Sequence, residues 1–220
     1  SQALLCNTTG VQNEAMGYFA LCANTTGGCN TAIGSALGKN TTGTENVAIG
    51  FISLGSNTSG SNNTAIGRSS LQENTTASGN VAVGNLTGDA LTTGHSHTAL
   101  GFCALTTATT GEGNTALGNS ALKLTTTGSD NLAVGRRALC INTTGGNNTS
   151  VGPYTMTSNT TGAGNVAVGI QALCSNTTAG NNVAVGINAS LANTTGTQNT
   201  TIGHEAGCAI TTGSNNIMIG

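Results

Sequence analysis

A glycine that closes a short aliphatic motif returns every 17 residues along the whole chain. The motif reads Asn-Thr-Ala-Ile-Gly at 30–34, and its closing glycines are Gly17, Gly34, Gly50, Gly67, Gly84, Gly101, Gly118, Gly135, Gly152, Gly169, Gly186, Gly203 and Gly220. Only the step from Gly34 to Gly50 is 16 residues long. A period this short and regular is typical of a solenoid, in which each repeat is one coil. The sequence therefore predicts thirteen stacked coils in a single repeat region over residues 1–220.

The amino-acid composition excludes some classes of function. Only 5% of the residues are charged and 2% are aromatic, so the basic patch that nucleic-acid binding requires is missing. No run of about 18 apolar residues occurs, so no membrane insertion is expected in this segment. Because Ser1 enters in mid-repeat and Gly220 would open another repeat, we expect a segment of a longer fibrous protein.

With the glycine as slot 1, the consensus is G-x-x-A-L-x-x-N-T-T-G-x-x-N-T/V-A-I/V. Slot 17 is always aliphatic and mostly β-branched, which favours a short strand with one buried face. We predict that these side chains form the core, with slot 15 on the same face. Slot 16, on the opposite face, is nearly always alanine, which suggests that something packs closely against it. The predicted core residues are Ile33, Ile49, Ile66, Val83, Leu100, Leu117, Val134, Val151, Val168, Val185, Ile202 and Ile219.

Ala-Leu in slots 4 and 5 predicts a second short strand in each coil, as at 20–21 and 104–105. In two coils glycine takes slot 5 and an aliphatic residue follows three places later, as Leu91 and Ile210. A helical alternative fails because each repeat holds glycine and many β-branched residues. The expected fold is all-β, a parallel β-solenoid or β-roll.

Asparagine recurs in slot 14, interrupted only by His97. In stacked coils about 4.8 Å apart, amide side chains in equal slots can hydrogen-bond to one another as a ladder. The predicted ladder comprises Asn13, Asn30, Asn46, Asn63, Asn80, Asn114, Asn131, Asn148, Asn165, Asn182, Asn199 and Asn216.

Asn-Thr-Thr in slots 8–10 has two interpretations. Asparagine and threonine bond their own backbone and tolerate left-handed geometry, so a turn is the favoured one. The triplet also matches the N-glycosylation acceptor pattern. The candidate acceptors are Asn24, Asn74, Asn142, Asn159, Asn176 and Asn193.

Seven cysteines leave at least one without an internal partner. Cys140, Cys174 and Cys208 share slot 6 two coils apart, about 9.6 Å, which is too far for a bridge. Cys6 and Cys22, in adjacent coils, are the one plausible internal disulfide. The alternatives are cross-links between chains of a fibre and simple buried thiols.

Nothing in the sequence predicts catalysis. The seven acidic residues are scattered over different slots, so neither a carboxylate pair nor a calcium loop is built. His95 and His97 near Asp89 could in principle hold a metal, but both replace ordinary turn and ladder residues. We therefore expect no enzyme, no cofactor and no metal site.

The motifs NTAIG, NVAVG and NVAIG, followed by a Ser/Ala-rich segment, resemble the head repeats of trimeric autotransporter adhesins. The longer ALxxNTTGxxN form is similar to repeat arrays of phage tail-fibre and giant-fibre proteins. This resemblance covers the whole chain and implies a left-handed parallel β-roll, commonly in a trimer. It also implies that the alanine row of slot 16 contacts another chain, because only small side chains allow such an approach. It departs in the longer repeat, the NTT turn and the cysteines.

Three functional hypotheses follow. The leading one is a structural extracellular, cell-surface or virion-borne fibre segment, which self-associates into a homo-oligomer or filament and can be adhesive toward a surface receptor or glycan. The alternative is an ice-binding solenoid with ranks of threonine and asparagine. Against it, the adjacent threonines of NTT would point to opposite faces. A carbohydrate-binding or hydrolytic tail spike lacks the aromatic residues and acid pairs that it needs.

Overall fold

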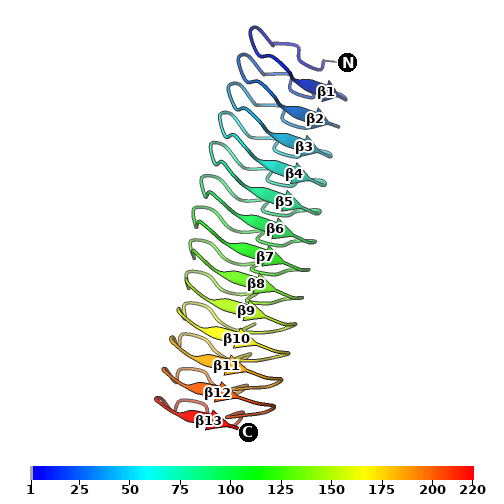
Figure 1. Ribbon diagram of the computed structural model, residues 1–220. Coiled ribbons are helices and arrows are strands. Elements are labelled where there is room, and N and C mark those ends of the chain that lie inside the picture. Colours follow the sequence, from blue (N-terminus) through cyan, green and yellow to red (C-terminus); the bar gives the residue numbers. More distant parts are fainter. Residues whose placement is uncertain (1) are drawn as a thin grey trace. The chain divides into compact units, whose positions relative to one another are not determined.

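The computed structural model describes residues 2–220, which are all-β and form a parallel β-solenoid. The chain divides into two compact units, one ending at Thr110 and the other spanning Gly111–Gly220. Each coil contributes one three-residue strand, and the strands of each unit lie side by side in chain order (Figure 1). None of the described elements is a helix with the length and hydropathy of a membrane span.

The strands of the first unit are β1 (Glu14–Met16), β2 (Thr31–Ile33), β3 (Val47–Ile49), β4 (Thr64–Ile66), β5 (Val81–Val83) and β6 (Thr98–Leu100). Those of the second unit are β7 (Thr115–Leu117), β8 (Leu132–Val134), β9 (Thr149–Val151), β10 (Val166–Val168), β11 (Val183–Val185), β12 (Thr200–Ile202) and β13 (Ile217–Ile219).

Neighbouring strands within a unit pair in parallel, with equal slots opposite each other. Ala32 lies opposite Ala48, and Ala48 lies opposite Ala65. The same register is kept across the 16-residue coil between β2 and β3. Leu37 remains fully buried there, so the missing residue falls between Gly34 and Leu37, in a turn.

The slot 1 glycine is required for two reasons. Gly67 has a φ of +129°, a conformation that side chains rarely adopt. In addition, a Cβ on Gly67 would lie 2.4 Å from the carbonyl oxygen of Gly84 in the next coil. The invariance of slot 1 is therefore a consequence of close stacking of the coils.

The interior of the coils is not formed by the slot 17 side chains that the sequence predicts. Slot 16 alanines, such as Ala32, Ala48 and Ala65, are fully buried, and they pack in the same interior as the slot 4 alanines and the slot 5 leucines. Because side chains alternate along a strand, slots 15 and 17 must then face outward. The inward assignment of slot 17 is wrong, and so is the prediction that the alanine row contacts another chain.

All twelve predicted core residues lie on the outer side of the strands. Ile66 and Leu100 are 37% and 41% exposed, and Ile219 at the end of the chain is 77% exposed. The others are half-buried or similarly exposed: Ile33, Ile49, Val83, Leu117, Val134, Val151, Val168, Val185 and Ile202. The narrow coil explains this, since its interior accepts only a small side chain in slot 16, which is alanine in most coils and Ser150 or Thr201 in two others.

The Ala-Leu segment is buried as predicted, but it is not a strand. Ala20 and Leu21 are both fully buried although they are adjacent, which an extended chain does not allow. Leu21 has a φ of 51°, and this left-handed conformation turns both side chains inward. Leucine in slot 5 recurs with the same sign of φ in both units, at a cost of about 1 kcal/mol or more each.

Candidate functional site

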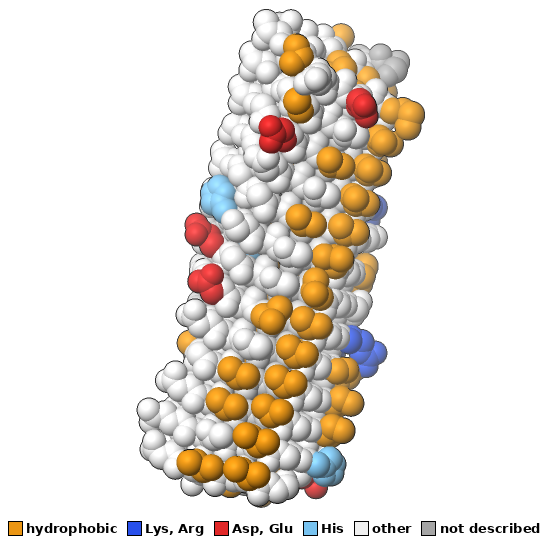
Figure 2. Space-filling model, viewed as in Figure 1, with side chains coloured by type: hydrophobic (Ala, Val, Ile, Leu, Met, Phe, Trp, Pro, Cys, Tyr) orange, Lys and Arg blue, Asp and Glu red, His pale blue; other side chains and the backbone are white. Residues whose placement is uncertain are grey.

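The outward side chains of slots 15 and 17 form an apolar surface on each unit. We call this surface the outer β face. Apart from Glu14 in the first coil, slot 15 holds either threonine or an aliphatic residue, as at Thr64 and Val81, whereas slot 17 is aliphatic throughout. Figure 2 shows these side chains in rows that run from coil to coil. Several of these side chains are 36–41% exposed, as Val81 and Ile202 are, and many of the others are half-buried.

The slot 14 asparagine ladder is confirmed. In each unit the backbone N–H of each slot 14 residue after the first donates to the side-chain oxygen of the asparagine one coil earlier, at 2.9–3.1 Å. The side-chain amide of Asn46 donates to Asn30 Oδ1 at 3.1 Å and to the carbonyl oxygen of Gly60 at 2.9 Å. His97 keeps the main-chain bond, donating to Asn80 Oδ1 at 2.9 Å.

Slot 8 forms a second asparagine ladder inside the coils. Asn40 donates to Asn24 Oδ1 at 2.8 Å and to its own coil's Gly43 carbonyl at 3.0 Å. The same carbonyl also accepts from Asn30 at 2.9 Å. One slot 11 carbonyl thus joins both ladders.

The candidate glycosylation sites are contradicted by this ladder. An acceptor asparagine must present its amide nitrogen to solvent, but the six candidates are at most 1% exposed. They are Asn24, Asn74, Asn142, Asn159, Asn176 and Asn193. Their amides are engaged in the interior, so the turn interpretation of NTT is correct.

Threonine side chains in slot 9 also form hydrogen bonds to the next coil. Thr41 Oγ1 donates to the Thr58 carbonyl at 3.0 Å, and Thr160 Oγ1 donates to the Thr177 carbonyl at 3.1 Å. Slot 10 threonines, such as Thr76 and Thr178, are exposed. Each residue of the triplet therefore has its own environment.

All seven cysteines are free thiols in the structure. Cys6 and Cys22 lie in adjacent coils, where the Cys6 backbone N–H donates to the Cys22 carbonyl at 3.1 Å, but no disulfide joins them. Cys140 is buried, whereas Cys174 and Cys208 are half-buried. Cross-linking between chains stays a prediction.

The ionisable residues of the described chain were the remaining candidates for a site. Among residues 2–220, no group of three or more His, Cys, Asp or Glu side chains is placed to hold a metal ion. Burial, and secondarily Glu73, raise the pKa of Asp89, while Arg68 acts in the opposite direction. Asp89 Oδ1 is buried without a hydrogen-bond partner.

Comparison of the chain with protein-family models, curated proteins and solved structures finds no match.

Two features were missed in the sequence. The outward direction of slots 15 and 17 could have been recognised from Glu14, because a charge in slot 15 is incompatible with a dry interior. The second is a cluster of Lys123, Arg136 and Arg137 in slots 6, 2 and 3 of adjacent coils. Reading basic residues by slot, instead of by overall charge, would have found it.

Proposed function

We propose that the chain is a structural segment of an extracellular fibre, in which copies of the chain associate through the outer β face. The observation that carries this proposal is the unbroken row of half-exposed aliphatic side chains in slot 17, on a surface with almost no charge. Contiguous exposed apolar surface of this kind commonly marks an interaction site. The resemblance to adhesin and fibre repeats supports the same assignment and an extracellular or virion location.

A second copy of this chain is the occupant that fits best. It offers the same aliphatic rows at the same coil spacing of about 4.8 Å, so side chains of two copies can interdigitate along each unit. In the second unit, seven three-residue strands give a face of roughly 300 Å². Because a standard interface buries about 800 Å² per partner, we expect association to depend on many coils acting together.

Light scattering of the full chain tests the proposal. We expect a mass of two or more chains, and we expect the double variant Ile66→Lys/Ile202→Lys, with one charge on each unit's outer β face, to be monomeric. The matched control Thr76→Lys/Thr178→Lys adds the same charges on exposed turns and should keep the native mass. A monomeric native chain, or equal behaviour of both variants, would contradict the proposal.

Ice binding remains the second candidate, for one specific reason. In the strands whose slot 15 is threonine, a threonine and an aliphatic residue lie two residues apart on the outer β face, which gives exposed pairs that NTT does not provide. The asparagine ranks of the original hypothesis are excluded as a surface, because both ladders are buried. Thermal hysteresis in a dilute solution of a monomeric chain would favour ice binding over the fibre.

A further inference from the structure

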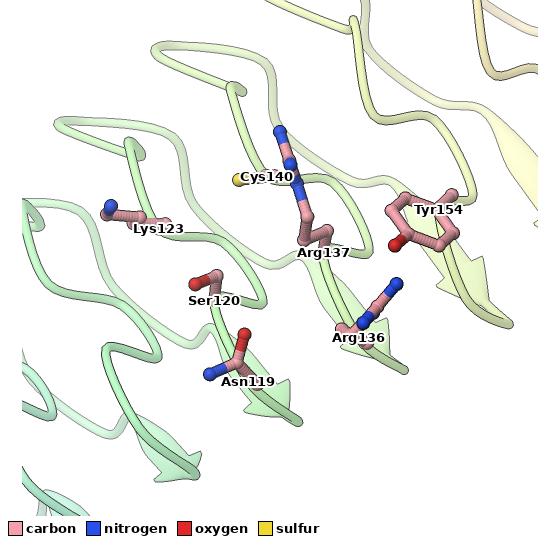
Figure 3. Close-up of a pocket in the computed structure, with 7 residues that line it drawn as sticks. All are labelled: Asn119, Ser120, Lys123, Arg136, Arg137, Cys140 and Tyr154. Atoms are coloured by element: carbon pink, nitrogen blue, oxygen red, sulfur yellow. The ribbon is translucent and has the colours of Figure 1, made fainter.

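One open pocket in the second unit gathers all of that unit's basic side chains. Lys123, Arg136 and Arg137 line it together with Tyr154 and the buried thiol of Cys140 (Figure 3). These residues come from the three successive coils that follow β7, β8 and β9. The cavity volume is about 400 Å³, which falls within the range of small-ligand sites.

The two arginines of this pocket lie away from the acidic residues of the second unit. The acidic residues of the second unit are Glu112, Asp130 and Glu205. Glu112 and Asp130 occupy slots 12 and 13, before the strand, whereas the pocket's cations follow it. Glu205 shares slot 3 with Arg137 but lies four coils away, about 19 Å. The cations therefore produce a local positive potential that an anion would neutralise.

The arginine and tyrosine side chains are already arranged with respect to each other. The guanidinium carbon of Arg136 lies 4.8 Å from the ring centroid of Tyr154, a cation–π contact that restricts both side chains. Figure 3 shows the tyrosine oxygen pointing toward the arginines. Each arginine fork matches the planar geometry of a carboxylate or the oxygens of a sulfate.

The rest of the lining favours a sugar as the carrier of this anion. Asn119 and Ser120 add amide and hydroxyl groups that can bond sugar hydroxyls, and Tyr154 adds an aromatic ring. A nucleic acid would require an extended basic track, which three cations do not supply. An acidic peptide would be expected along an unpaired strand edge, which this pocket does not offer.

We propose that this pocket binds an acidic sugar unit, through its carboxylate or sulfate group, from an anionic glycan. This names a partner class for the adhesive role of the proposed fibre. Binding to the pocket is a property of one chain, however, so it can succeed or fail independently of self-association.

Isothermal titration calorimetry of the full chain at low ionic strength tests the proposal. The probes are a uronic-acid disaccharide, a sulfated disaccharide, a neutral disaccharide of the same linkage and sodium sulfate. We expect at least one acidic disaccharide to bind, and to bind at least tenfold more tightly than the neutral sugar and than sodium sulfate. No binding of either acidic sugar, or equal binding of the neutral one, would overturn the proposal. Sulfate binding as tight as the acidic sugars would also overturn it, by showing an anion site without sugar recognition.

The variant Arg136→Asn/Arg137→Gln removes both guanidinium groups. The new side chains already occur in the same slots of other coils, as Asn119 and Gln171. Affinity should fall at least tenfold, as expected for loss of a charge-assisted bidentate contact. The matched control is Arg68→Asn, which removes a cation from the same slot in the first unit and should change affinity less than twofold. Light scattering on the same samples separates this result from the association state. Unchanged affinity in a folded double variant would exclude the pocket as the site.

Discussion

Buried asparagine is the residue that distinguishes this interior from an ordinary apolar core. A side-chain amide carries two donors and one acceptor, so it can bond the coils above and below when they are about 4.8 Å apart. Asn57 illustrates this, donating to Asn40 Oδ1 at 2.8 Å and to the Gly60 carbonyl at 3.0 Å while accepting from Asn74 at 2.9 Å. Such groups are stabilising only while every partner is present.

Replacing Asn57 by alanine should therefore destabilise the chain by about 2–3 kcal/mol. The change leaves a cavity and removes the donor to Asn40 Oδ1, which stays buried. Urea denaturation followed by circular dichroism measures the effect. The control Asn85→Ala removes an exposed asparagine and should change the free energy of unfolding by less than about 0.5 kcal/mol. Equal effects would show that the amide ladder contributes nothing specific.

Asp89 gives a pH-dependent prediction. Its raised pKa means that the folded chain binds this proton more tightly than the unfolded chain. The charge therefore destabilises the fold at neutral pH, and this cost disappears as the pH falls through the raised pKa to below the ordinary value of 3.8.

Asp89→Asn should consequently raise the thermal midpoint at pH 7 and have no advantage below pH 3.8. The gain should stay below about 1 kcal/mol, because water screens a half-exposed carboxylate. Thermal unfolding of both proteins across this pH range is the measurement, with the exposed Glu112→Gln as control. A variant that is less stable than the native chain at pH 7 would show that the carboxylate is stabilising there.

At the scale of the element, the period and the ladder slot were predicted from the sequence, whereas the face of the strand that points inward was predicted wrongly, and only Glu14 indicated the correct face. Recurrence of Gly and Asn fixes how coils align, since equal slots must stack. Direction depends on interior volume, and a row of Ile and Val looks more buried than a row of alanine. The turn at Leu21 was also missed, because a left-handed leucine has no signature in composition. The pocket cations escaped notice since the overall charge of −2 conceals their clustering.

Strand β4 offers a direct test of this direction. Ala65 is fully buried and Ile66 is 37% exposed, although they are neighbours. Ala65→Leu should overpack the interior and cost about 1–3 kcal/mol or more. Ile66→Ser should cost less than about 1 kcal/mol, because the side chain loses only part of a contact with its strand neighbours. Chemical denaturation in dilute solution, where association is minimal, compares the two. The opposite order would restore slot 17 as the core.

At the scale of the molecule, the same kinds of interaction stabilise both units. Each coil contacts its neighbours through backbone bonds, amide ladders and alanine–leucine packing, so stability is approximately a sum of nearest-neighbour terms. Charges take almost no part in it, since the whole chain has five basic and seven acidic residues. Charge distinguishes the two proposed functions. The outer β face, which is proposed for association between chains, is apolar, whereas the pocket proposed for glycan binding is cationic.

Salt should therefore separate stability and association from glycan binding. Between 0.05 and 0.5 M NaCl the Debye length falls from about 14 Å to about 4 Å, so interactions between exposed charges are strongly weakened. We expect the thermal midpoint and the mass from light scattering to stay constant over this range, while affinity for an acidic disaccharide falls at least tenfold. The loss of affinity also serves as the internal control that the salt range is sufficient. A mass that falls with salt would show that the contacts between chains are ionic, and would exclude the aliphatic rows as the surface that drives assembly.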